Sequence, residues 1–255
     1  MKMRNDVWIK RSRQDPQTCF RLFCFPYAGG GASFFRTWRE RLPQDIEVCA
    51  VQLPGREDRF RETPFDRLSS LIDELADVIY PYLDFPFAFF GHSLGALISF
   101  ELTRLLRRQK ASCPMQLFVS GSRAPQIPDP DPPIHQLPDA EFIDELRCLN
   151  GTPKAVLDNP ELMEVFLPLL RSDIGLHETY VYDHEPPFDC PISAFGGLED
   201  EEVSREELAA WHDQTRSRFS IQMFPGDHFF LNGKESKGVL EVITKDIRKI
   251  TGKTK

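Results

Sequence analysis

The chain has 255 residues, a formal net charge of −8 and a hydrophobic fraction of 41%, which is enough to bury a sizeable core in a single domain. The acidic balance argues against nucleic acid as a partner, because phosphate binding needs a concentrated positive face. Six scattered cysteines without a C-x-x-C pair or a histidine cluster indicate reduced thiols and no metal centre. The polar residues 1–18, and the lack of an apolar stretch near the ~20 residues that span a bilayer, predict a cytoplasmic protein without a membrane partner.

Short apolar runs alternate along the chain with amphipathic helical stretches. This alternation is typical of an α/β fold, a mostly parallel sheet flanked by helices on both faces. The predicted strands are 20–25, 46–51, 85–90, 115–120, 192–195 and 219–224, and the predicted helices are 34–41, 66–82, 94–109, 204–217 and 236–250. We expect one domain over residues 1–255.

The regular alternation stops between Gly121 and Cys190. Residues 128–133 are proline-rich and cannot form a helix or a central strand. Two helices are predicted next, one with Asp139 as N-cap and one with Asn159 as N-cap before Pro160. We interpret residues 122–188, approximately, as a helical lid inserted between two strands.

The second predicted lid helix is apolar on more than one face. One stripe contains Leu162, Val165, Phe166, Leu169 and Leu170, and Met163 and Leu167 widen it. Such a helix is either buried against the sheet or faces an apolar ligand, and for any single residue plain packing explains the pattern as well. For the lid as a whole we favour an acyl-chain channel, with Met163, Phe166 and Leu167 as candidate lining residues.

The pentapeptide Gly91-His92-Ser93-Leu94-Gly95 follows a predicted strand and precedes a predicted helix. On spacing alone this G-x-S-x-G pattern is weak, but a strand, a sharp turn and a helix are the setting in which its serine becomes a nucleophile. Glycines flank the serine because a side chain there would collide with neighbouring backbone. The motif therefore predicts Ser93 as a catalytic nucleophile.

A serine nucleophile needs a base to remove its proton and a carboxylate to orient that base. Active groups of an open α/β sheet lie at the carboxyl ends of strands, which selects His228, just after the strand ending at Phe224. His92 adjoins the serine, but its side chain is expected to point away from the exposed Oγ. We therefore predict His228 as the base.

Three neighbouring carboxylates follow the predicted strand 192–195. Asp200 is the best placed, because hydrolases of this kind order their triad Ser, acid, His along the chain. Glu199 remains the alternative. We interpret Glu201 and Glu202 as charges at a helix N-terminus.

The oxyanion of a tetrahedral intermediate needs two preorganised N–H donors. One should be the backbone N–H of Leu94, directly after the nucleophile. The other should come from the glycine-rich loop at residues 26–31, where Tyr27 and Ala28 both remain candidates. That loop matches neither the phosphate-binding lysine pattern nor the dinucleotide fingerprint, so no nucleotide cofactor is expected.

Several blocks of sequence in order resemble the type II thioesterases that accompany modular polyketide synthases and nonribosomal peptide synthetases, relatives of the medium-chain thioesterase of fatty acid synthase. The blocks are Leu22–Gly30, Gln52–Glu57, Pro86–Gly95, Leu149–Pro153 and Gly226–Leu231. The resemblance implies an α/β-hydrolase fold, a triad of Ser93, Asp200 and His228, and release of acyl groups from phosphopantetheine on acyl or peptidyl carrier proteins, in an editing role and without a cofactor of its own.

Two other functions stay open at this point. A carboxylesterase or lipase would use the same triad, which does not distinguish oxygen from sulfur leaving groups, and a non-catalytic binding protein would keep only the fold. A chain-terminating thioesterase fused to a synthetase is disfavoured, because the sequence starts at Met1 without an upstream carrier domain.

Carrier proteins are generally acidic, so docking on this acidic chain would need a local basic patch. The arginines that could supply it are Arg36, Arg39, Arg56, Arg59, Arg61, Arg104, Arg107 and Arg108. Charge reversal at Arg56 or Arg59 is expected to raise KM for acyl-carrier substrates and to leave small acyl thioesters unaffected.

Overall fold

The computed structural model describes residues 7–11, 16–233 and 236–252. Within these ranges the strands form one sheet in the order β1-β3-β2-β4-β5-β6-β7, with β1 antiparallel and the other pairs parallel. The strands are β1 Ile9–Arg11, β2 Phe20–Phe25, β3 Ile46–Val51, β4 Phe87–His92, β5 Leu117–Ser120, β6 Ile192–Gly197 and β7 Phe219–Phe224. The predicted α/β class is confirmed.

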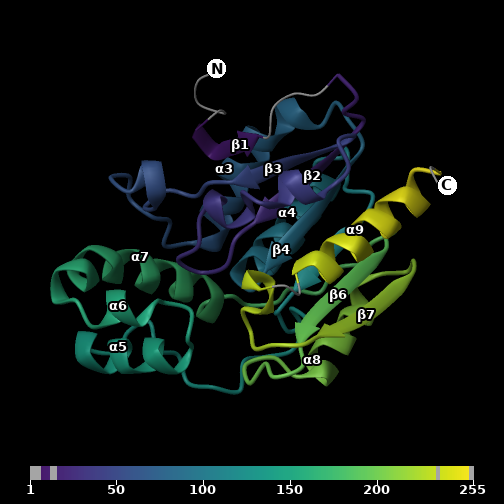
Figure 1. Ribbon diagram of the computed structural model, residues 1–255. Helices are drawn as coiled ribbons and strands as arrows, with labels where there is room; N and C mark the ends of the chain where they lie inside the picture. Colours follow the sequence, from purple (N-terminus) through teal and green to yellow (C-terminus); the bar gives the residue numbers. More distant parts are fainter. Residues whose placement is uncertain (1–6, 12–15, 234–235, 253–255) are drawn as a thin grey trace.

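Helices cover both faces of this sheet (Figure 1). One face carries α3 (Leu68–Ile79), α4 (Leu94–Arg108) and α8 (Arg205–Ala209), and the other carries α2 (Trp38–Arg41) and α9 (Ser236–Ile250). Side chains of β4 alternate between the two cores: Phe87 and Phe89 pack on the α3 and α4 side, and Ala88 and Phe90 on the α9 side. A central strand buried on both faces therefore reads as a continuous apolar run.

Several predicted boundaries move for local reasons. β4 starts at Phe87 instead of Phe85, because Pro86 has no N–H to give to a ladder. α3 ends at Ile79, and Tyr80–Tyr82 form a 3₁₀ turn that contains Pro81. The predicted helix 204–217 is a short α8 followed by a 3₁₀ segment, Ala210–Gln214. The edge strand β1 was not predicted, because three residues are too few to show a period.

An insertion between β5 and β6 carries three helices: α5 (Asp139–Cys148), α6 (Lys154–Leu157) and α7 (Pro160–Glu178). They lie beside the sheet, at the lower left of Figure 1. The Asn159 side chain accepts a hydrogen bond from the N–H of Leu162, so the predicted cap of α7 is confirmed. The predicted cap of α5 is wrong, because Asp139 is already the first helical residue and Pro138 precedes it without a side-chain acceptor.

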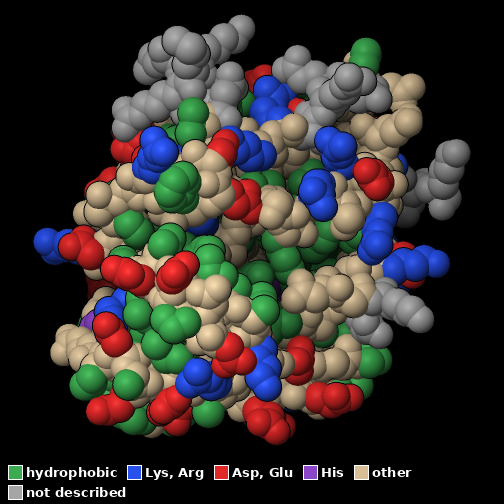
Figure 2. All heavy atoms as spheres, turned by 60° about the vertical axis from the view of Figure 1, so that its left-hand side comes forward, with side chains coloured by type: hydrophobic (Ala, Val, Ile, Leu, Met, Phe, Trp, Pro, Cys, Tyr) green, Lys and Arg blue, Asp and Glu red, His purple; other side chains and the backbone are tan. Residues whose placement is uncertain are grey.

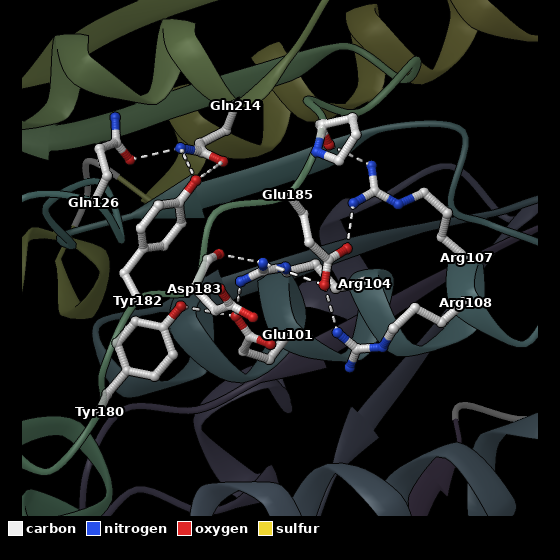
Figure 3. Close-up of polar contacts among 11 residues, drawn as sticks. Glu101, Arg104, Arg107, Arg108, Gln126, Tyr180, Tyr182, Asp183, Glu185 and Gln214 are labelled. Atoms are coloured by element: carbon white, nitrogen blue, oxygen red, sulfur yellow. Dashed lines mark hydrogen bonds and ion pairs between the residues drawn. The ribbon is translucent and has the colours of Figure 1, made fainter.

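Polar contacts hold the return segment, residues 179–191 between α7 and β6, against α4 (Figure 3). The Tyr180 hydroxyl donates to Glu101 at 2.7 Å, and Arg104 donates to the Asp183 carbonyl oxygen. Glu185 accepts from Arg107 at 2.7 Å and pairs with Arg108. These contacts fix one end of the insertion to the sheet domain.

No described helix is both long and apolar enough to cross a bilayer.

Candidate active site

Ser93 lies in the turn between β4 and α4 with φ 51° and ψ −119°, a conformation that non-glycine residues rarely adopt. Holding a side chain there costs about 1–3 kcal/mol, which the surrounding structure must offset. The Ser93 N–H donates to the Ser120 carbonyl at 2.8 Å, and the Ser93 carbonyl accepts from Ala96 at 2.8 Å. Both backbone groups are therefore anchored while the side chain stays half-buried beside a cavity.

The two glycines of the motif are required by close backbone approaches. A Cβ on Gly91 would lie 2.1 Å from the carbonyl oxygen of Gly95, and a Cβ on Gly95 would lie 2.1 Å from that of Phe25. Either side chain would push α4 away from the sheet. The packing explains why the turn needs glycine on both sides of the serine.

His228 and Asp200 meet at the carboxyl ends of β7 and β6. The Nδ1 atom of His228 lies 3.0 Å from Oδ2 of Asp200, and the side chains are 7% and 0% exposed. Burial lowers the pKa of His228, but the hydrogen bond to Asp200 and the charge of Glu202 outweigh that effect and leave the pKa above its ordinary value. A carboxylate at Nδ1 leaves Nε2 as the ring nitrogen available for proton transfer.

The second oxygen of Asp200 organises the loop after β6. Its Oδ1 accepts the N–H groups of Glu202 at 2.9 Å and Val203 at 3.1 Å. This turn keeps residues 201–203 out of α8, whose N-cap is Ser204. The interpretation of Glu201 and Glu202 as helix N-terminal charges is therefore wrong.

Glu202 instead lies at the reactive side of the histidine. One of its carboxylate oxygens is 3.8 Å from Nε2 of His228, and its side chain is 34% exposed. Partial burial raises the pKa of Glu202, against the lowering effect of His228. Glu199, the alternative acid, is exposed and lies outside the residues that line the cavity described below.

His92 lies beneath the turn and is completely buried. Its Nδ1 is 3.0 Å from the Ser120 hydroxyl, and its ring packs 5.1 Å from that of His228. Burial, and then the neighbouring His228, lower the pKa of His92 well below its ordinary value, so this ring is neutral. His92 is not among the residues that line the cavity beside Ser93.

The glycine-rich loop after β2 lies opposite the first turn of α4. Leu94 is the first residue of α4, so its N–H has no acceptor within the helix. Gly30 donates to the Tyr27 carbonyl at 2.9 Å, and Gly29 donates to Asp173 at 2.6 Å. Tyr27 and Ala28 line the same cavity as Ser93.

A cavity of about 380 Å³ brings these residues together with the insertion. Ser93, Leu94 and His228 line it from the sheet domain. Its apolar lining from the insertion includes Leu146, Leu149, Leu170 and Ile174. One face of the molecule is hollowed, with hydrophobic side chains inside the hollow and both signs of charge around it (Figure 2).

The three lid residues expected in an acyl channel lie elsewhere in the insertion. Met163 is 2% exposed and packs in the insertion's own core with Phe142, and Leu167 packs against the same core. Phe166 is 37% exposed. The neighbouring turn of α7 lines the cavity, through Leu170 and Ile174.

Three arginines of the expected docking patch lie in the interior: Arg56, Arg59 and Arg104 are 2–5% exposed. Arg56 forms a bidentate ion pair with Asp173, and Arg59 pairs with Glu62. Charge reversal at either site would bury an unpaired charge, so the expected use of Arg56 or Arg59 as a docking probe is wrong. Among the described residues, the exposed members of that set that form no ion pair are Arg36, Arg39 and Arg61.

No group of three or more His, Cys, Asp or Glu residues stands ready to hold a metal ion in the described part of the chain.

Comparison with known proteins places this geometry in a family. The family model described as a thioesterase domain matches residues 20–247. The gramicidin S biosynthesis protein GrsT of Aneurinibacillus migulanus is 49% identical over 242 residues, which cover 94% of each chain.

Solved structures agree with this match. The type II thioesterase BorB from the borrelidin biosynthetic cluster superposes with a TM-score of 0.86 at 37% identity, over 95% of this chain and 98% of its own. RedJ, a thioesterase from the prodiginine biosynthetic pathway in Streptomyces coelicolor, gives a TM-score of 0.84 at 38% identity, over 92% of this chain and 90% of its own. The chain belongs to the thioesterase family, in its α/β-hydrolase branch of type II enzymes.

Proposed function

We propose that this chain is a serine thioesterase that hydrolyses acyl groups from the phosphopantetheine arms of acyl or peptidyl carrier proteins, in an editing role beside a polyketide or nonribosomal peptide assembly line. The observation that supports it most is the strained Ser93 turn beside the same cavity as the His228 and Asp200 pair, in a chain of the thioesterase family. Of the proteins that the chain resembles, GrsT is named as a gramicidin S biosynthesis protein and BorB as a type II thioesterase from the borrelidin biosynthetic cluster.

In the proposed reaction, the Ser93 hydroxyl attacks the thioester carbonyl carbon while Nε2 of His228 takes the hydroxyl proton. Asp200 holds the ring through Nδ1 and stabilises the imidazolium that forms. The carbon–sulfur bond then breaks, and the thiolate receives the proton from His228. Because the pKa of a thiol is about 8.5, the thiolate can leave with little help from a general acid. Water, deprotonated by the same nitrogen, then splits the acyl-serine ester to give the free acid and Ser93.

The negative oxygen of each tetrahedral intermediate would accept the N–H of Leu94 and an N–H of the glycine-rich loop. Because the amides of Gly29 and Gly30 donate elsewhere, Ala28 and Tyr27 remain the candidates for the second donor. The thioester's acyl group would occupy the cavity under the insertion, which acts as the lid. The proposed chemistry uses no cofactor of the enzyme's own.

The proposal is tested by comparing kcat/KM for acyl-pantetheine thioesters with that for matched oxygen esters, and for carrier-bound acyl groups of two to twelve carbons. A clear preference for thioesters, increased by the carrier, is expected. Preference for the oxygen esters would identify a carboxylesterase or lipase instead. If a fluorophosphonate fails to label the native chain, the remaining reading is a non-catalytic binding protein.

Exchange of Glu202 for glutamine is expected to move the acid limb of the pH profile to lower pH. His228 acts as a base only when neutral, so activity is lost as the pH falls through its raised pKa, and removing the Glu202 charge lowers that pKa. At alkaline pH, kcat should change less than about fivefold, because a partly exposed charge pair is worth under about 1 kcal/mol. The measurements are kcat and kcat/KM for an acyl-pantetheine across pH.

The matched control for Glu202→Gln is Glu206→Gln, which removes an exposed carboxylate from the first turn of α8. Its acid limb should coincide with that of the native enzyme. An unmoved limb in the Glu202 variant would mean that this carboxylate does not influence the base.

A further inference from the structure

Asp173, in the C-terminal half of α7, is a buried carboxylate that accepts hydrogen bonds from three N–H donors. Its side chain is 1% exposed. Oδ1 accepts from Arg56 at 2.8 Å, and Oδ2 accepts from Arg56 at 2.6 Å and from the N–H of Gly29 at 2.6 Å. A charge removed from water is tolerated only with such a complete set of partners. The insertion is therefore tied directly to the glycine-rich loop after β2.

The same loop is held by two further polar side chains from the segment after β3. Arg56 also donates to the Gly30 carbonyl at 3.2 Å. Gln52 accepts the N–H of Ala32 at 2.8 Å and donates to the Arg56 carbonyl at 3.0 Å. Gly29, Gly30 and Ala32 are thus each fixed through a backbone group. Of the three side chains that fix them, only Asp173 belongs to the insertion.

These contacts bear on the oxyanion donors. The loop turns between Tyr27 and Gly30, where Gly30 donates to the Tyr27 carbonyl. Ala28 stands one residue before Gly29, so the Asp173 hydrogen bond fixes the peptide unit next to the candidate donor. Leu170, one turn earlier in α7, packs on the same loop: a Cβ on Gly29 would lie 2.7 Å from its Cδ2.

We propose that Asp173 is a positioning residue through which the insertion sets the geometry of the oxyanion hole. It touches no reacting atom; it holds the loop so that the Ala28 or Tyr27 N–H points at the developing oxyanion. The inference rests on the proposed function and adds that the insertion shapes the transition-state site as well as the acyl cavity. A displaced donor should reduce kcat more than KM, because the oxyanion exists only beyond the ground state.

Two double variants test this role without leaving a buried charge unpaired. Arg56→Met with Asp173→Leu removes both charges and the acceptor for Gly29. It should lower kcat for an acyl-pantetheine about 10- to 100-fold with KM within about threefold, as a misplaced oxyanion donor predicts. Arg56→Met with Asp173→Asn restores an acceptor oxygen for Gly29 and should recover much of the lost kcat.

A trifluoromethyl ketone supplies the second measurement, because its tetrahedral adduct with Ser93 places an oxyanion where the intermediate has one. Its affinity should fall in parallel with kcat across the variants. If the Met and Leu variant does not fold, Arg56→Gln with Asp173→Ala decides the matter, because it also removes both charges and the acceptor for Gly29: kcat and ketone affinity that fall together support the inference, and native values overturn it.

The matched control is Glu101→Leu with Arg104→Met. These residues form a largely buried ion pair of 2.8 Å within α4, and both also bind the return segment of the insertion, through Tyr180 and Asp183 (Figure 3). Its kcat should stay within about threefold of the native value. An equal loss of kcat in this control would show general loosening and overturn the inference. If the native enzyme neither hydrolyses thioesters nor reacts with a fluorophosphonate, the proposed function itself fails; an active native enzyme with unchanged Asp173 variants defeats only the positioning role.

Discussion

Replacement of Ser93 by alanine is expected to lower kcat for acyl-pantetheine hydrolysis at least about 10⁴-fold, as loss of the nucleophile does in serine hydrolases. The methyl group cannot form the acyl ester, and His228 would then have only water to activate. Residual turnover would come from the oxyanion donors and substrate binding. The measurement is steady-state hydrolysis followed by thiol release, together with fluorophosphonate labelling, which should disappear.

Ser99→Ala is the control for that experiment, because it removes a nearby serine hydroxyl that is buried in α4 and donates to the Ala96 carbonyl at 2.8 Å. It should cost about 1 kcal/mol of stability and leave kcat within a few fold. Thermal unfolding of both variants shows that each is folded. More than a tenth of native activity in a folded Ser93 variant would remove this serine from the mechanism.

Sequence reasoning works best where a local pattern decides position. The apolar runs of β2 to β7 predicted six strands. The G-x-S-x-G motif between a strand and a helix identified Ser93, and the rule that active groups follow the carboxyl ends of strands selected His228. The structure brings both to one cavity. Each of these inferences needs only a few neighbouring residues.

The site residues that the sequence did not predict depend on contacts between distant segments. Asp173 and Arg56 are 117 residues apart and bind each other in the interior, so a pattern within either segment cannot pair them. The sequence did offer one signal: the Asp173 carboxylate lies on the apolar stripe of α7 that contains Phe166, Leu169 and Leu170. A buried charge on such a stripe indicates a partner, but not which one.

The insertion shows why a helical pattern does not predict which neighbour each face of a helix packs against. α7 is apolar around most of its first three turns, so its sequence does not say which side meets α5 and which meets the cavity. Met163 turned to the insertion's core, while Leu170 and Ile174 reach the cavity. Glu202 was missed because its role depends on a contact between distant segments: in the turn that Asp200 forms with two backbone amides, the Glu202 carboxylate lies 3.8 Å from Nε2 of His228.

Replacement of Asp200 by asparagine is expected to lower kcat by about 10³- to 10⁴-fold and to move the acid limb of the pH profile to lower pH. The carboxylate accepts from Nδ1 of His228 and from two backbone amides, so an amide in its place must turn a donor toward one of them. A hydrogen bond donated to Nδ1 would put the ring proton on Nε2, where the base must be free. Loss of the negative charge also lowers the pKa of His228, so the small remaining activity should persist to lower pH than in the native enzyme.

Glu199→Gln separates the two candidate acids in that experiment. Glu199 is exposed, and its N–H donates to Gly226, so its side chain should be replaceable with kcat and the pH profile unchanged. A profile of kcat/KM against pH for both variants, with Tm as the check of folding, gives the answer. A folded Asp200→Asn enzyme with near-native kcat, or a deep loss in the Glu199 variant, would transfer the orienting role to the exposed neighbour. We expect Asp200 to be the orienting acid, because its side chain is 0% exposed and solvent therefore screens its interaction with His228 very little.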